Sequence, residues 1–194
     1  MKKEEALAIL EETGAYQRGH FKLSSGLHSD VYVQCAQLLM HPALAERICR
    51  EVADLWRDDK PEMVVGPAIG GILVAYEVGR ALQVPTIFAE RENGVMTLRR
   101  GFAPHVTKGM RVLVTEDVLT TGGSAQEVVA LLQEQGAEVI GAASIIDRTQ
   151  GNQVKLTVPY RSLISLEAGT YPPEDCPLCA EGSPINKPGS RPGL

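Results

Sequence analysis

Two adjacent carboxylates, Glu116 and Asp117, follow an apolar run and precede a loop of Thr, Gly and Ser residues. The run Val112–Val114 is short and β-branched, which is typical of a buried parallel strand. Ser124 is a good N-cap for a helix, and Glu127, three residues later, completes a capping box. The loop is therefore expected to present free backbone N–H groups at the N-terminus of a helix, where anions bind.

The chemistry of this segment favours a ligand with a phosphate at one end and hydroxyl groups nearby. Ionised carboxylates only accept hydrogen bonds and would repel a phosphate. Glu116 and Asp117 are therefore suited to bind hydroxyl groups. Ribose 5-phosphate carries both groups. The sequence has neither a Walker lysine nor a G-x-G-x-x-G pattern, which argues against nucleoside triphosphates and dinucleotides. For the loop alone, a Gly-rich surface turn is the simpler alternative.

Other segments with possible chemistry lie before and after this loop. Arg91, Arg99 and Arg100 occur in one polar, Gly-containing connection and could clamp a pyrophosphate, the alternative being a solvated charged loop. The turn Gly66–Gly71 would let a ligand approach the backbone closely, or it is only a tight strand-to-helix turn. Arg148 ends an apolar run and could pair with an anionic base, or with a neighbouring acid at the strand end.

The elements that must position these residues alternate between strands and helices. Helices are expected over residues 2–13, from Pro42 to Trp56, and over 72–82 and 124–134; strands over 63–65, 86–89, 111–115 and 138–146. This alternation predicts an α/β fold in which helices flank a central parallel sheet. Ligands bind such sheets at the carboxyl ends of the strands, where all the segments named above lie.

The predicted domain organisation is simple. Residues 1–165 form a single domain, in which a small antiparallel hairpin over about residues 14–35 precedes a core over about 40–165. The tail, residues 166–194, is too rich in Pro and Gly for regular structure and is expected to be a wrapped arm or partly disordered.

The overall composition excludes several classes of function. The 194 residues, 44% of them hydrophobic, are enough for one full core. A net charge of −5 does not suggest nucleic-acid binding. No apolar stretch approaches the length of a membrane span, and the charged N-terminus lacks the apolar core of a signal peptide, so we expect a cytoplasmic protein.

The four cysteines are too few for a disulfide scaffold of this size. Two of them form a C-x-x-C motif at Cys176 and Cys179 in the tail. A closed zinc site needs four ligands, and the histidines lie far from this motif in the sequence. The pattern therefore favours two free thiols and no metal in the isolated monomer; a half-site completed by a second subunit is the alternative.

The segment from Val112 to Ser124 matches, at every position, the phosphoribosyl-pyrophosphate (PRPP) signature of the type I phosphoribosyltransferases. The hairpin segment Phe21–Gly26 resembles the hood motif F-x-L-x-S-G of the orotate phosphoribosyltransferase family. Gly66–Gly71, Arg91 and Asp147-Arg148 follow in that family's order and spacing. Many members carry lysines where this chain has Ser24 and Gly70, and their mobile loop is longer.

The resemblance implies the type I phosphoribosyltransferase fold with an N-terminal hood, and the transfer of ribose 5-phosphate from PRPP to orotate. The products are orotidine 5′-monophosphate and pyrophosphate, in pyrimidine (UMP) biosynthesis. It also implies a homodimer, and Mg²⁺ held mainly through PRPP without a metal site of the protein's own. A purine phosphoribosyltransferase and a non-catalytic PRPP-sensing regulator are the alternatives.

The resemblance also implies roles for individual residues. Catalysis is expected of Glu116, Asp117, Arg99 and Arg100. Substrate binding is expected of the acid pair, of the loop that follows it and of residues in four other segments: Glu116, Asp117, Val118, Leu119, Thr120, Thr121, Gly122, Gly123, Ser124, Arg91, Arg148, Ser25, Gly26, Gly70 and Gly71.

Overall fold

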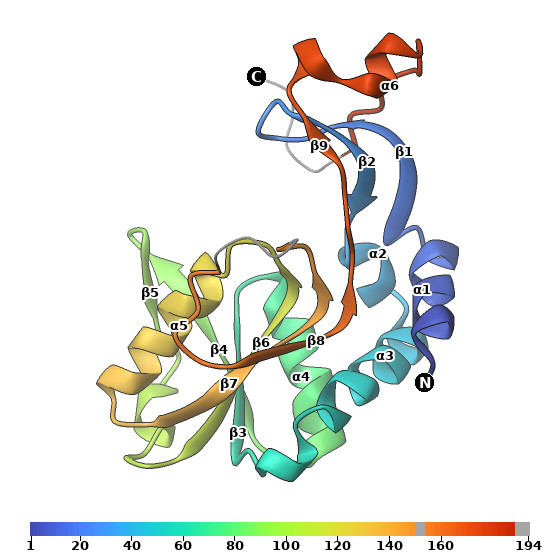
Figure 1. The fold of residues 1–194 in the computed structure, drawn as a ribbon. Helices are drawn as coiled ribbons and strands as arrows, with labels where there is room; N and C mark the ends of the chain where they lie inside the picture. The colour runs from blue at the N-terminus through green and yellow to red at the C-terminus, as the bar shows by residue number, and fades with distance from the viewer. Residues whose placement is uncertain (150–153, 189–194) are drawn as a thin grey trace.

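A computed structural model describes residues 1–149 and 154–188 and divides them between a large and a small sheet. Figure 1 shows the large sheet between layers of helices, with the small sheet standing off its carboxyl edge. Within the described residues, the large sheet has the strand order β5-β4-β3-β6-β7-β8 and the small sheet the order β1-β2-β9.

The elements follow one another along the chain with short connections. The helices are α1 (Lys3–Glu12), α2 (Ala36–Leu39), α3 (Pro42–Asp54), α4 (Gly70–Leu82), α5 (Gly123–Glu134) and α6 (Pro177–Ala180). The strands are β1 (Tyr16–Lys22), β2 (His28–Val33), β3 (Met63–Pro67), β4 (Thr86–Glu92), β5 (Val95–Thr97), β6 (Arg111–Leu119), β7 (Glu138–Asp147), β8 (Tyr160–Ser165) and β9 (Thr170–Tyr171). Single 3₁₀ turns cover Arg57–Asp59, Ala103–His105 and Pro173–Asp175.

The central strand β6 is buried on both faces, as a parallel strand between two helical layers must be. Leu113 packs into the cluster formed with α1, α3 and α4, whereas Val112 and Val114 pack into the cluster formed with α5. All three side chains are fully buried. The strands β3, β4, β6, β7 and β8 pair in parallel, and β5 adds an antiparallel edge to β4. The predicted α/β sheet is therefore confirmed.

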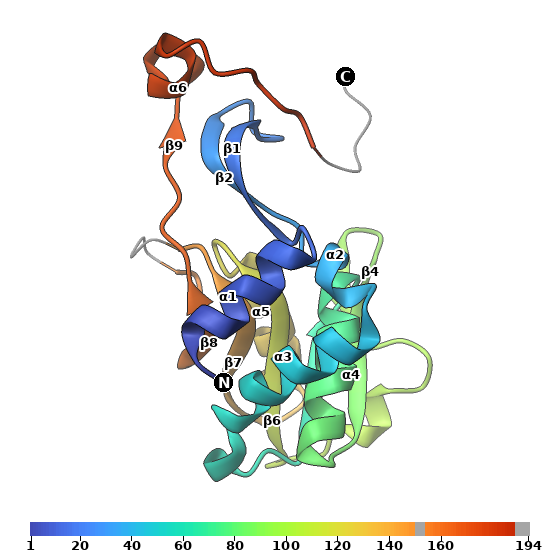
Figure 2. The ribbon, with the colours of Figure 1, turned by 90° about the vertical axis from the view of Figure 1, so that its right-hand side faces the viewer.

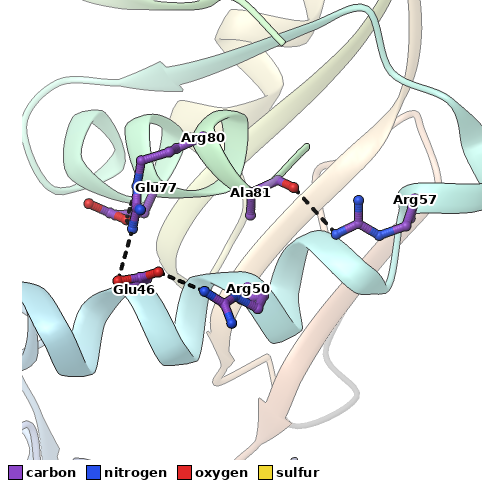
Figure 3. Close-up of polar contacts among 6 residues, drawn as sticks. All are labelled: Glu46, Arg50, Arg57, Glu77, Arg80 and Ala81. Atoms are coloured by element: carbon purple, nitrogen blue, oxygen red, sulfur yellow. Dashed lines mark hydrogen bonds and ion pairs between the residues drawn. The ribbon is translucent and has the colours of Figure 1, made fainter. Parts of the chain in front are cut away.

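Helices α3 and α4 cover one face of the sheet together, and a set of polar contacts crosses between them (Figure 3). Glu46 on α3 lies 2.6 Å from Arg50 on the same helix and 3.4 Å from Arg80 on α4. Arg57, just after α3, donates to the carbonyl oxygen of Ala81 at 3.4 Å. Exposed ion pairs of this kind contribute little to stability, so the buried apolar faces of the two helices hold them together.

The tail forms more regular structure than its composition predicted. β9 pairs antiparallel with β2, and the backbone N–H of Lys22 on β1 donates to the carbonyl of Asn186 at 2.9 Å. Figures 1 and 2 both show the tail crossing the end of the small sheet that lies farthest from the large one. The tail, as far as residue 188, is thus a wrapped arm; residues 189–194 lie outside the described residues.

Two local predictions around the carboxylates are wrong. The strand extends to Leu119, so both acids lie inside β6 rather than after it. The capping box at Ser124 does not form, because α5 begins at Gly123 with Gly122 as its N-cap, at φ 74°. Glu127 pairs instead with Arg91, at 2.5 Å.

Further elements were not predicted, among them the short helix α2. The connection after β4 folds back as β5, and β8 pairs with β7 as a further parallel strand. The tail supplies β9 and the single-turn helix α6. Among the described residues, no helix has both the length and the apolar character needed to cross a membrane.

Candidate functional site

The carboxyl ends of β3 and β6 bring the turn Gly66–Gly71 against the acid pair. A β-carbon on Gly70 would lie 2.5 Å from Oδ2 of Asp117, and one on Gly66 would lie 2.1 Å from the carbonyl oxygen of Gly71. These two glycines therefore make room for the carboxylate and for the tight turn. The other oxygen of Asp117, Oδ1, accepts a hydrogen bond from the N–H of Val118 at 2.8 Å, which fixes the orientation of the carboxylate.

Glu116 lies half-buried beside Asp117, and its backbone pairs with Ser144 on β7. Burial, and then the neighbouring charge of Asp117, raise the pKa of Glu116 to about 8. The carboxyl group is thus largely protonated at neutral pH. A protonated carboxyl donates one hydrogen bond as well as accepting others, so Glu116 can contact a hydroxyl in either sense.

The loop from Thr120 to Ser124 joins β6 to α5 at the same edge of the sheet. Thr120, Thr121 and Ser124 are exposed, and Gly122 is buried. The first N–H groups of α5 have no acceptor within the helix, so they point out of its N-terminus with the positive end of the helix dipole. This is the predicted anion site, and the structure brings it next to the acid pair.

Two backbone hydrogen bonds join this loop and the end of β6 to the segment between β7 and β8. The carbonyl oxygen of Leu119 accepts from the N–H of Arg148, at 2.8 Å, and that of Thr121 from the N–H of Lys155, at 2.9 Å. Gly122 adopts a left-handed conformation, and a β-carbon there would lie 3.0 Å from a methyl group of Val154. Glycine is therefore required at this position both by conformation and by space.

Arg148 follows β7 directly and brings a half-buried guanidinium group to this edge. Its Nε is buried without a hydrogen-bond partner among the described residues. Burial lowers the pKa of Arg148, and the charge of Asp30 partly opposes that shift. An unpartnered buried donor of this kind is costly, and an anionic ligand would satisfy it.

The three arginines of the predicted clamp each contact an acid instead of one another. Arg91 on β4 pairs with Glu127 through both terminal nitrogens, at 2.5 and 2.9 Å. Arg99 lies 3.5 Å from Glu92, and Arg100 lies 3.0 Å from Glu90. A pyrophosphate would therefore compete with these acids for the guanidinium groups.

The hood turn is not brought to the Thr120–Ser124 loop within this chain. Ser25 and Gly26 lie at the tip of the β1–β2 hairpin, where the N–H of Gly26 donates to the carbonyl of Leu23 at 2.9 Å. Figure 1 shows this tip well apart from the carboxyl end of β6. The predicted contact of Ser25 and Gly26 with a base therefore depends on closure of the hood or on another subunit.

Sequence reasoning missed one residue of this region, Asp30 on β2. It lines a cavity of about 510 Å³ together with Glu167, Ala168 and Gly169, and its Oδ1 accepts from the N–H of Gly169 at 2.7 Å. The negative charge of Asp30 also acts on Arg148 and favours its charged form. No sequence pattern marks it, because the hood and the tail segment meet only in the folded chain.

Comparisons with known proteins show the family to which the chain belongs. The family profile of the phosphoribosyl transferase domain matches residues 34–170. A curated relative from Caldanaerobacter subterraneus subsp. tengcongensis, named orotate phosphoribosyltransferase, is 50% identical over 191 residues, which cover 98% of this chain and 99% of that protein.

Two solved structures show how far the fold itself is shared. Orotate phosphoribosyltransferase from Aeropyrum pernix has a TM-score of 0.69 at 26% identity, covering 82% of this chain and 92% of that one. Adenine phosphoribosyltransferase from Rhodothermus marinus has a TM-score of 0.67 at 21% identity, covering 84% of this chain and 99% of that one. The second likeness shows the fold alone, so the fold by itself does not identify the base.

Proposed function

Because this chain belongs to the orotate phosphoribosyltransferase family, we propose that it transfers the ribose 5-phosphate group of PRPP to orotate. The products are orotidine 5′-monophosphate and pyrophosphate, in the synthesis of pyrimidine nucleotides. The observation that carries the proposal is the meeting of three segments at one edge of the sheet: the Gly66–Gly71 turn, the Glu116–Asp117 pair and the N-terminus of α5.

Each of the three segments suits one part of PRPP. The first turn of α5 and the Thr120–Ser124 loop offer N–H and hydroxyl donors to the 5-phosphate. Glu116 and Asp117 accept hydrogen bonds from the ribose hydroxyls, and the protonated form of Glu116 can also donate one. The Gly66–Gly71 turn lies beside Asp117, where the diphosphate would extend from the ribose.

The reaction exchanges groups at the anomeric carbon of the ribose. The bond to pyrophosphate breaks as the bond to orotate forms, and the transition state has oxocarbenium character. The site accelerates this step by holding the reactants in line and by stabilising charge on the departing pyrophosphate, without a covalent nucleophile.

Mg²⁺ fits the oxygen-rich edge of this site. The carboxylate of Asp117 faces the space that Gly70 leaves free, and hard oxygen ligands are those that Mg²⁺ prefers. Bound mainly through PRPP, the ion would neutralise part of the negative charge that develops on pyrophosphate.

Arg148 is assigned to the carboxylate of orotate. A guanidinium group pairs with a carboxylate through two parallel hydrogen bonds, and the buried Nε of Arg148 lacks a partner among the described residues. This assignment distinguishes orotate from purine bases, which have no carboxylate.

The working form is proposed to be a cytoplasmic homodimer. The four cysteines are free, as is usual in a reducing compartment. The hood tip stands apart from the Thr120–Ser124 loop in one chain, and Arg99 and Arg100 contact Glu92 and Glu90. A two-fold partner is the simplest way to bring such segments to a facing site.

One assay tests the function directly. The protein is incubated with PRPP, Mg²⁺ and orotate, uracil, adenine, hypoxanthine or xanthine in turn, and the nucleotide formed is identified by chromatography. We expect orotidine 5′-monophosphate alone, and none when Mg²⁺ is chelated. Turnover of a purine without orotate would make the protein a purine phosphoribosyltransferase, and PRPP binding without any turnover would make it a regulator; neither alternative is favoured, since relatives at about 50% identity carry the orotate name.

A further inference from the structure

Four potential metal ligands from three distant segments meet at the outer end of the small sheet. They are His20 on β1, His28 on β2, and Cys176 and Cys179 at the start of the single-turn helix α6. One ligand atom of each lies within 4.8 Å of the other three. We propose that this cluster binds one Zn²⁺ ion per chain as a structural site. The proposal does not depend on the enzymatic function.

The premise that the C-x-x-C motif has only two ligands is therefore wrong. The rings of His20 on β1 and His28 on β2 lie edge to face with their centroids 4.9 Å apart, so both imidazoles are on the same side of the hairpin. The tail crosses that side and brings Cys176 and Cys179 to the two rings. Sequence distance concealed the cluster, because the tail returns to the hood after more than a hundred residues.

The distances within the cluster are close to those of a tetrahedral shell around one ion, although the two imidazole nitrogens lie slightly closer together than in such a shell. Nε2 of His20 lies 3.0 Å from Nδ1 of His28 and 3.5 Å from Sγ of Cys176. Sγ of Cys179 lies 3.3 Å from Nδ1 of His28 and 3.7 Å from Nε2 of His20. Zn–N bonds of about 2.1 Å and Zn–S bonds of about 2.3 Å in a tetrahedron place ligand atoms roughly 3.3–3.8 Å apart.

The orientation of His20 is set by the tail itself. Its Nδ1 lies 2.9 Å from the carbonyl oxygen of Ser183, which can only accept a hydrogen bond. Nδ1 therefore carries the proton, and Nε2 presents its lone pair to the cluster. Hydrogen bonds of this kind, from the second ring nitrogen to a backbone carbonyl, are typical of histidines that bind metals.

The chemistry of the ligands selects the ion and its role. Two thiolates with two imidazoles form the Cys₂His₂ set of structural zinc sites, whereas Mg²⁺ and Ca²⁺ prefer oxygen. With four protein ligands the shell is closed, so no position remains for a substrate. His20, His28 and Cys176 are at most 4% exposed, and Cys179 lies at the surface, where the ion can enter.

A metal at this place would fasten the tail to the hood. The small sheet stands off the main core, and a hairpin of this size is marginally stable without further support. β9 and the Asn186 contact already join the tail to β2 and β1. The ion would close this arrangement by linking both strands to α6, so its binding energy would add to the stability of the hood.

The test is metal analysis of the full-length protein, prepared with a reductant and dialysed against metal-free buffer. We expect one zinc per chain by plasma mass spectrometry, and a fall in the hood's protection from hydrogen exchange when zinc is removed by a strong chelator. Co²⁺ added to the stripped protein should give the intense visible bands and the thiolate charge-transfer bands of a tetrahedral site with two sulfurs.

Variants identify the ligands. Cys179→Ser and His28→Gln should each lower the zinc content to about one-tenth or less, whereas His41→Gln, at an exposed histidine outside the cluster, should leave it unchanged. Unmodified protein that takes up neither zinc nor Co²⁺ would overturn the proposal whether or not any variant folds. Half a zinc per chain, or full zinc in His28→Gln, would overturn the intrachain ligand set.

Discussion

The carboxylate of Asp117 occupies the space that a side chain at Gly70 would need, since a β-carbon there would stand 2.5 Å from its Oδ2. Gly70 opens α4 just after β3, and Asp117 lies in β6, the strand next to β3 in the sheet. The acid that is proposed to hold the ribose is thus positioned by the turn that is proposed to hold the diphosphate.

Gly70→Ala should weaken PRPP binding more than it weakens the fold. The atom that must move is the end of an Asp side chain, which can rotate, but rotation breaks its hydrogen bond with Val118. The rotated carboxylate would also no longer accept a hydrogen bond from the ribose of PRPP. Loss of one charge-assisted bond of this kind costs about 1.5–3 kcal/mol, or roughly ten- to a hundredfold in PRPP affinity. Calorimetric titration with PRPP measures the affinity, and thermal unfolding measures the stability.

A double-mutant cycle with Asp117→Ala controls for other effects of the added methyl group. Once the carboxylate is absent, Gly70→Ala should cause no further loss of PRPP affinity. Equal losses in both backgrounds would show that the methyl group acts elsewhere, for example on the start of α4.

Arg148→Ala should raise the Kd for orotate while the Kd for PRPP changes little. The physical reason is the loss of a paired contact with the orotate carboxylate, and Arg148→Lys should recover only part of it, because a lysine cannot make two parallel bonds. Calorimetry with each substrate measures the two constants. Arg47→Ala, at an exposed arginine 2.8 Å from Glu5, is the control, and equal weakening of both substrates would assign Arg148 to the architecture of the site.

Glu116→Gln should change how stability depends on pH. The unfolded chain ionises this residue near its ordinary pKa of 4.5, but the folded chain does so at about 8. Between these values the folded state holds a proton that the unfolded state has lost, so ionisation makes the free energy of unfolding fall as pH rises. The fall contributed by this residue approaches about 1.4 kcal/mol per pH unit inside the window and ends above it.

The variant cannot ionise at this position, so its free energy of unfolding should rise relative to that of the wild type as pH rises. Urea unfolding at about pH 5, 7 and 9 measures both values. Asp117→Asn provides a second check. Removing the neighbouring charge should lower the pKa of Glu116, and so narrow the pH range over which this residue makes stability fall. Parallel pH profiles for the wild type and Glu116→Gln would contradict the raised pKa.

The sequence predicted best what depends on local pattern. The run Val112–Val114 is a buried strand, the helix of residues 2–13 is α1 (Lys3–Glu12), and the order of strands and helices gives the parallel sheet. The place of the Thr120–Ser124 loop follows because strand, loop and helix are contiguous. The prediction of the helix start failed because Gly122, in a left-handed conformation, is the N-cap of α5, and Glu127 pairs with Arg91.

What the sequence could not predict depends on contacts between distant segments. The pairing of each arginine with an acid, the approach of Asp117 to Gly70 and the cavity beside Asp30 arise only when strands and tail are assembled. The histidines of the hood and the cysteines of the tail are the clearest case, since neither pair is informative without the other.

Arg99 and Arg100 should act in the active site of a partner subunit. Within one chain they contact Glu92 and Glu90 on the exposed β4–β5 edge, so a partner's bound pyrophosphate would have to replace those acids. A doubly charged phosphate group competes well for a guanidinium, and closing the loop over it would also exclude water. Arg99→Ala/Arg100→Ala and Asp117→Asn should each be almost inactive as pure proteins.

Subunit exchange between these two inactive proteins separates action in trans from action within one chain. A mixed dimer has one site with an intact Asp117 that faces the intact arginines of its partner, so activity should return to roughly a quarter of the wild-type value in an equal mixture, in which about half of the dimers are mixed and each has one working site. Native mass spectrometry of isotope-labelled subunits verifies that exchange has occurred. If exchange is complete and the mixture stays inactive, the arginines serve their own chain, because the intact Asp117 and the intact arginines then never meet in one site.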